Sequence, residues 1–79
     1  MDSMAATERQ ESKMTVTING ETREVAAGTT VTGLLTGLGL QPGLIVVEHN
    51  REILDRSSFD VTEVRAGDRL ELVHFVGGG

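Results

Sequence analysis

Residues 15–25 read TVTINGETREV, and this stretch decides how the fold begins. Val16 and Ile18 alternate with threonines, which is the pattern of a strand with one buried face. The Asn19-Gly20 pair follows, and Asn-Gly is typical of a two-residue hairpin turn because both residues tolerate positive φ. The stretch therefore predicts a β-hairpin with strands at 15–19 and 21–25.

An amphipathic helix is predicted after the hairpin. Apolar residues recur there at the i, i+3, i+4 and i+7 spacing of one helix face. They are Val31, Leu34, Leu35 and Leu38. Thr30 is suited to the N-cap, Gly39 to the C-cap, and Pro42 prevents continuation. Because Gly33 and Gly37 each cost about 1 kcal/mol relative to alanine, this helix needs packing against a sheet for its stability.

Two further strands are predicted in the middle of the chain. The apolar run at 44–47 is typical of a strand that is buried on both faces. Asn50 and Arg51 form a turn, and a short strand follows at 52–54.

The last strand is predicted at 69–76, after a loop at 55–60 with one 3₁₀ turn and a turn at 66–68. A hairpin, a helix and then strands predict an α+β roll, in which a mixed sheet packs against one main helix. The expected core consists of Val16, Ile18, Val31, Leu34, Leu35, Leu38, Val47, Leu70 and Leu72.

Composition excludes several classes of protein. Twelve acidic residues against seven basic ones give a formal net charge of −5, so the positive surface that nucleic acids need is missing. No apolar run approaches the roughly 20 residues of a membrane-spanning helix. The chain contains no cysteine, which excludes disulfides and thiolate ligands. We expect a cytoplasmic protein with one domain at 14–76, a disordered extension at 1–13 and a glycine tail at 77–79.

The two histidines, His49 and His74, make a poor catalytic set. Neither has a nucleophile or a clear carboxylate partner in the sequence, so a surface or strand-edge position is expected for both. No spacing supplies enough ligands for a metal, and we predict no metal site.

The end of the chain, FVGGG at residues 75–79, is the candidate functional segment. Glycine has no side chain, so such a tail is thin enough to carry a carboxylate into another protein's active site. The alternative is a frayed terminus or a linker. If Leu70 and Leu72 point into the core, Val73 and Phe75 point to the other face and form an apolar docking patch. The alternative is that the final strand kinks and Phe75 caps the core.

Four segments together resemble the ThiS family, the sulfur carriers of thiamine biosynthesis. They are Val16-x-Ile18-Asn19-Gly20, Thr30-Val31-x-x-Leu34-Leu35, Gly67-Asp68-x-Leu70-Glu71-Leu72-Val73 and Val76-Gly77-Gly78-Gly79. The resemblance covers residues 14–79 and implies the β-grasp, or ubiquitin-like, fold.

The resemblance also implies a protein co-substrate rather than an enzyme. A ThiF-type adenylyltransferase would use ATP to activate the carboxylate of Gly79, and a sulfur donor protein would convert it into a thiocarboxylate. Gly78 would pass through the partner's channel, while Phe75, Val73, Val76 and Gly77 would contact the partner. The sulfur would go to a ThiG-type thiazole synthase. We expect a free monomer with no bound cofactor.

Three alternatives remain open. The small subunit of molybdopterin synthase, of the MoaD family, shares the fold and the tail but tends to be longer between the helix and the last strand. A ubiquitin-like modifier would be joined to lysines of its targets. The only lysine here is Lys13, which weighs slightly against a tag that builds polymers on itself. An interaction domain with an inert tail is the third alternative.

Overall fold

The β1–β2 hairpin forms where the alternation predicts it. The computed structural model describes residues 12–75, in which β1 (Lys13–Ile18) pairs antiparallel with β2 (Glu21–Ala26). Asn19 has φ 49° and Gly20 φ 84°, as a two-residue turn with both central residues in the left-handed region requires. The predicted boundary of the extension is one residue too late, because Lys13 is the first residue of β1 and lies opposite Ala26. Residues 1–11 of the extension and the tail at 77–79 lie outside the described residues, and what was predicted for them remains a prediction.

The helix α2 (Val31–Gly37) also forms where its apolar stripe predicts it. The Thr30 hydroxyl accepts a hydrogen bond from the Gly33 N–H at 3.1 Å, so the predicted N-cap is confirmed. At the other end, the N–H groups of Gly39 and Leu40 donate to the carbonyls of Thr36 and Leu35, each at 2.9 Å. This is the Schellman pattern, which needs the left-handed φ of 81° found at Gly39.

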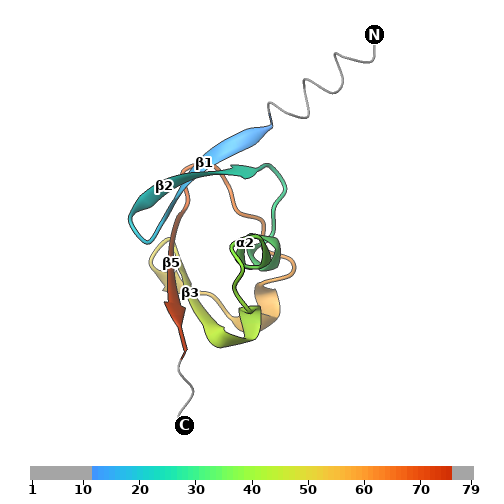
Figure 1. Cartoon of the computed structure of the whole chain (residues 1–79), viewed down its shortest axis with the longest axis vertical. Helices are drawn as coiled ribbons and strands as arrows, with labels where there is room; N and C mark the ends of the chain where they lie inside the picture. Colours follow the sequence, from blue (N-terminus) through green and yellow to red (C-terminus); the bar gives the residue numbers. More distant parts are fainter. Residues whose placement is uncertain (1–11, 76–79) are drawn as a thin grey trace.

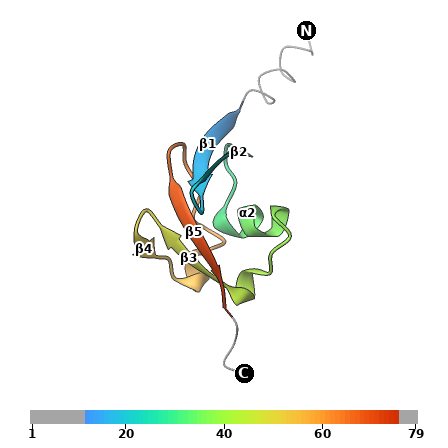
Figure 2. The same cartoon turned by 60° about the vertical axis from the view of Figure 1, so that its left-hand side comes forward.

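The remaining elements complete one mixed sheet. They are η1 (Pro42–Leu44), β3 (Ile45–His49), β4 (Glu52–Ile53), η2 (Arg56–Ser58) and β5 (Arg69–His74). The strand order is β2-β1-β5-β3-β4, with β1 and β5 parallel and the other neighbours antiparallel. Figures 1 and 2 show α2 on one side of the sheet. The predicted mixed sheet with one main helix, the β-grasp arrangement, is confirmed.

The core lies between α2 and the sheet. Its buried members are Val16, Ile18, Val31, Leu34, Leu35, Ile45, Val47, Phe59, Val64 and Leu70. Leu38 and Leu72, which were also predicted to be in the core, are partly buried against this cluster. Phe59 and Val64 are additions that the apolar patterns did not predict, because both belong to the long segment between β4 and β5.

One strand prediction was wrong in detail. Of the apolar run at 44–47, only Ile45 and Val47 are buried, so β3 is not buried on both faces. Leu44 belongs to η1 and is 40% exposed, while Val46 is half-buried on the face away from α2. The reason is that α2 covers one face of the sheet, and no described element covers the other.

The turn between β3 and β4 places two residues in the left-handed region. Asn50 has φ 50° and Arg51 φ 76°, so the predicted turn is confirmed even though Arg51 stands where glycine would fit without steric cost. Within residues 12–75, no helix is long and apolar enough to cross a membrane.

Candidate functional site at the end of β5

The end of β5 and the residue that follows it present two apolar side chains on the outer face of the sheet. Leu70 is buried and Leu72 partly buried toward α2, while Val73 is 59% exposed and Phe75 is 52% exposed. The exposure predicted for Val73 and Phe75 is therefore confirmed. Val76, Gly77, Gly78 and Gly79 lie outside the described residues.

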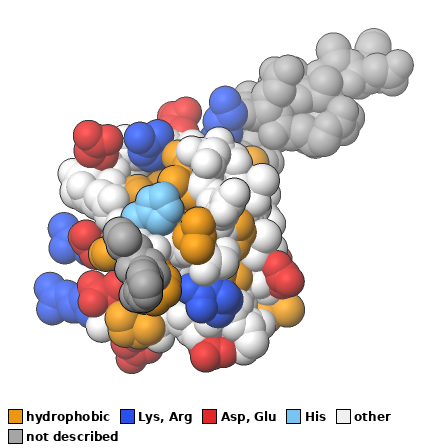
Figure 3. Space-filling model, turned by 60° about the horizontal axis from the view of Figure 1, so that its bottom comes forward, with side chains coloured by type: hydrophobic (Ala, Val, Ile, Leu, Met, Phe, Trp, Pro, Cys, Tyr) orange, Lys and Arg blue, Asp and Glu red, His pale blue; other side chains and the backbone are white. Residues whose placement is uncertain are grey.

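Neighbouring residues enlarge this exposed surface. Val46 lies directly across the ladder from Val73, and the Phe75 N–H donates to the Leu44 carbonyl at 2.6 Å. We call Leu44, Val46, Val73 and Phe75 the apolar patch. Figure 3 shows hydrophobic side chains gathered around the point where the described chain ends. An apolar surface of this kind is a common feature of protein interfaces.

Two polar side chains hold the strands beneath the patch. Asn19 accepts a hydrogen bond from the Leu72 N–H at 2.7 Å and donates to the Leu72 carbonyl at 3.3 Å, which replaces strand pairing where β1 has ended. Arg56 donates to the carbonyls of Pro42 at 3.3 Å and Ile45 at 3.1 Å on the far side of β3. The sequence suggested Asn19 only as a turn residue and gave no structural role for Arg56.

Two carboxylates lie opposite each other beside the patch. Glu48 on β3 and Glu71 on β5 form a directly opposed pair in the antiparallel ladder, on the same outer face as Val46 and Val73. Like charges in this position destabilise a sheet. Among the described residues, no basic group lies within ion-pair distance of either carboxylate. The pair thus adds a negative rim to the apolar patch.

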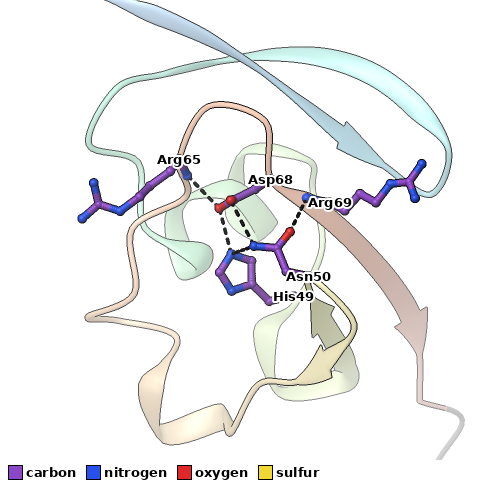
Figure 4. A network of polar contacts seen from close by, with 5 residues as sticks. All are labelled: His49, Asn50, Arg65, Asp68 and Arg69. Carbon is purple, nitrogen blue, oxygen red and sulfur yellow. Dashed lines mark hydrogen bonds and ion pairs between the residues drawn. The ribbon is translucent and has the colours of Figure 1, made fainter.

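His49 has a carboxylate partner, contrary to the expectation from the sequence. Its Nε2 lies 2.8 Å from the Asp68 Oδ2, and the side chain is only 22% exposed. Asp68 also accepts from the Arg65 N–H at 2.8 Å and from the Asn50 amide at 3.2 Å. Figure 4 shows both arginine guanidinium groups pointing away from this carboxylate. The network joins the β3–β4 turn to the start of β5.

His74 is exposed, as the sequence predicted. It lines a hollow of about 410 Å³ whose apolar wall includes Leu38, Leu40 and Leu72. Within residues 12–75, no three His, Asp or Glu side chains come close enough together to hold a metal ion.

The pKa of Asp68 is lowered in the folded chain. Burial acts to raise the pKa, but the hydrogen bonds from His49, Arg65 and Asn50 and the charge of His49 together outweigh burial. The ionised carboxylate is therefore favoured by folding. Its contribution to stability is fully present above the ordinary aspartate pKa of about 4 and is lost as the pH falls through the lower folded value.

We expect Asp68→Asn to lower the free energy of unfolding by about 1–3 kcal/mol at neutral pH, because hydrogen bonds to a charged, buried acceptor are lost. Urea unfolding followed by far-UV circular dichroism measures this difference. It should shrink as the pH falls below about 4, where the carboxylate of the unfolded chain becomes protonated, and disappear below the lower folded pKa of Asp68. Glu52→Gln, at an exposed position, is the control. A difference that does not change with pH would contradict the role assigned to the Asp68 charge.

A sequence model of the ThiS family matches residues 16–79. The chain belongs to the ThiS family. It is 38% identical over 50 residues to the sulfur carrier protein ThiS of Bacillus subtilis (strain 168), a match that covers 63% of this chain and 76% of that protein.

Two longer relatives are thiazole synthases. The chain is 41% identical over 66 residues to that of Magnetococcus marinus and 46% identical over 66 residues to that of Paramagnetospirillum magneticum. Each match covers 84% of this chain and 20% of the relative, so the chain spans about a fifth of their length.

Solved structures of ThiS share the fold. The crystal structure of the thiamine biosynthesis protein ThiS from Geobacter metallireducens superposes with a TM-score of 0.70 at 40% identity. The match covers 84% of this chain and all of that chain. The solution structure of a thiamine biosynthesis protein from the same organism gives a TM-score of 0.67 at the same identity.

Proposed function

We propose that this chain is a sulfur carrier in thiamine biosynthesis and that it carries sulfur as a thiocarboxylate on Gly79. The observation that supports this most strongly is the ThiS family match, which extends from β1 through all three tail glycines. The Bacillus subtilis relative, a sulfur carrier protein ThiS, supports the same role. The chain is then a co-substrate rather than an enzyme, and its folded part serves recognition.

The chemistry needs two steps on the Gly79 carboxylate. A carboxylate oxygen attacks the α-phosphate of ATP and pyrophosphate leaves, which produces an acyl-adenylate on a ThiF-type adenylyltransferase. Sulfur at the oxidation level of sulfide, from a donor protein, then attacks the carbonyl carbon and AMP leaves. Adenylation is required because a free carboxylate is a poor electrophile. ATP is bound by the partner, and this chain needs no cofactor of its own.

The apolar patch is the surface we assign to the adenylyltransferase. It lies at the end of β5, directly before the tail, so docking there brings residues 76–79 to the partner's active site. The unpaired Glu48 and Glu71 favour a partner with basic side chains around an apolar contact. Val76 and Gly77 continue from Phe75 and complete the proposed contact.

A thiazole synthase is the proposed acceptor of the sulfur. Two relatives that carry this name contain a segment similar to this chain within a longer protein. Placing a carrier and its acceptor on one chain raises their effective concentration, so such an arrangement favours partners that react with each other. The same relatives support the thiamine pathway over the MoaD-type alternative.

Intact mass spectrometry of the protein isolated from cells tests the proposal. We expect a form heavier by the mass difference between sulfur and oxygen, located on Gly79 by fragmentation. The same chain from cells without the adenylyltransferase is the control and should carry no sulfur. A chain that never acquires sulfur would overturn the carrier function, and chains joined to lysines of other proteins would support the modifier alternative instead.

Phe75→Asp should weaken binding to the adenylyltransferase roughly thirtyfold, because buried aromatic anchors commonly contribute about 2 kcal/mol or more to an interface. Titration calorimetry measures the affinity. Val61→Asp is the matched control, since Val61 is 78% exposed and lies outside the apolar patch. The Phe75 variant should keep its circular dichroism spectrum, and unchanged binding would remove Phe75 from the interface.

A further inference from the structure

The outer edge of β2 carries unpaired backbone groups. The Thr17 N–H donates to Asp68 and the Thr15 carbonyl accepts from Gly67, so the odd-numbered residues of β1 face β5. The even-numbered residues of β1 must then face β2, where their partners are Glu21, Arg23 and Val25.

The alternate residues of β2 therefore point their N–H and C=O groups away from the sheet. These residues are Thr22, Glu24 and Ala26. The Ala26 carbonyl accepts from the Thr29 N–H at 3.2 Å and from the Thr29 hydroxyl at 2.7 Å. Because β2 is the end strand of the sheet, no described strand pairs with the other groups. Such an edge is a template for another strand.

An apolar groove of about 260 Å³ runs beside this edge, between β2 and α2. It is lined by Glu24, Val25, Ala26, Thr29, Gly33, Leu34, Gly37 and Leu38. The groove is placed to receive side chains of a strand that pairs with β2. Every second side chain of such a strand would point toward the α2 side of the sheet and lie over the groove.

The two helix glycines keep the groove open, although the fold does not require glycine there. A Cβ atom at Gly37 would meet nothing within 4 Å, and one at Gly33 would make ordinary contacts with the Thr30 hydroxyl at 3.4 Å and the Thr29 methyl group at 3.6 Å. Neither residue has a positive φ. Since alanine would stabilise the helix at both positions, the absence of side chains is better explained by the groove than by the packing of α2.

The charges and hydrogen bonds of β2 argue against a second copy of this chain as the occupant. In symmetric antiparallel pairing of two β2 edges, the register centred on Glu24 places Glu24 opposite Glu24, and the register centred on Arg23 places Arg23 opposite Arg23, so both are repulsive. The register centred on Thr22 places Glu24 opposite Gly20 of the turn, and the register centred on Val25 needs the Ala26 carbonyl, which already accepts from Thr29. Arg23 has an acidic neighbour, Glu21, at 3.6 Å, whereas Glu24 has no basic group at ion-pair distance among the described residues. A basic side chain opposite Glu24 is complementary.

We propose that the edge of β2 and the groove beside α2 bind an extended segment of a partner protein as an added strand. A lysine or arginine of that segment lies opposite Glu24, and a neighbouring aliphatic side chain enters the groove next to Val25. The site is separate from the apolar patch, because β1 lies between β2 and β5 and the patch is on the face of the sheet away from α2. A partner can therefore hold this edge while the tail is engaged elsewhere.

Nuclear magnetic resonance titration of the full ¹⁵N-labelled chain tests this site with a capped peptide of alternating lysine and valine. We expect saturable shifts at the amides of Thr22, Glu24, Ala26 and Gly37, and none at Val73. The same peptide methylated on alternate backbone nitrogens should not bind, because it cannot pair with a strand. Absence of saturable shifts, or equal binding of the methylated peptide, would overturn the proposal.

Substitutions at Gly37 and Glu24 test the contributions of the groove and of the charge separately. Gly37→Leu should fill the groove and weaken binding about tenfold, whereas Gly37→Ala, which adds a single methyl group, should weaken binding much less. Glu24→Lys should weaken the lysine peptide about two- to fivefold and strengthen a glutamate–valine peptide by a similar factor. Unchanged affinity in Gly37→Leu, or no reversal of charge preference in Glu24→Lys, would show that the peptide binds elsewhere.

Discussion

Leu35→Ala should lower the free energy of unfolding by about 2–5 kcal/mol, a large part of the stability of so small a domain. Leu35 has no exposed surface and lies at the centre of the contact between α2 and the sheet. The smaller side chain would leave a cavity that surrounding side chains fill only in part. Urea unfolding followed by far-UV circular dichroism is the suitable measurement, because the chain contains no tryptophan or tyrosine.

Val61→Ala is the control for this measurement. It also removes apolar carbon atoms, but from a side chain that is 78% exposed, so the change should stay within about 0.5 kcal/mol. If Leu35→Ala were no more destabilising than Val61→Ala, the helix would not be packed on the core as described.

The sequence predicted the parts of this fold that depend on local patterns. The hairpin follows from strict alternation and from Asn19-Gly20, which fixes both the turn and the register. The helix follows from one apolar stripe with Thr30 and Gly39 at its ends. In each case the residues that determine the element lie within a few positions of one another, so the local sequence is enough to predict it.

Burial that depends on distant contacts was not predictable in the same way. Phe59 and Val64 belong to a segment without periodicity. The Phe59 carbonyl accepts from the Thr32 N–H at 3.1 Å, and the Val64 N–H donates to the Thr29 carbonyl at 2.8 Å. Sequence patterns do not show such bonds, because they join the segment before β5 to the start of a helix about thirty residues earlier.

The candidate site also has features that local patterns predict and features that depend on distant contacts. The exposure of Val73 and Phe75 followed from alternation once Leu70 and Leu72 were placed in the core. The contact between His49 and Asp68 did not, because these residues are 19 positions apart and meet only through the pairing of β3 with β5. Predicting the contact between His49 and Asp68 would have required the pairing of β3 with β5 and its register, which places His49 opposite Leu70.

A chain that ends at Gly78 should form the acyl-adenylate about a hundredfold more slowly than a chain that ends at Gly79. Both chains offer a glycine carboxylate, so the reacting group is the same, but the shorter chain loses up to about 3.5 Å of reach. Misplacing a reacting atom by about 1 Å can already cost a hundredfold in rate. Gly78→Val should have a similar effect, because a β-branched side chain widens the tail and restricts its backbone. ATP–pyrophosphate exchange with the cognate adenylyltransferase measures the rate.

Comparison with Phe75→Asp separates docking from chemistry. The truncated chain keeps the apolar patch, so it should bind the adenylyltransferase with unchanged affinity and fail only in the exchange reaction. Phe75→Asp keeps the tail, so raising its concentration should restore the exchange rate, whereas saturation should not rescue the truncated chain. Wild-type exchange rates from both tail variants would overturn the carrier function proposed for Gly79, whatever the patch binds.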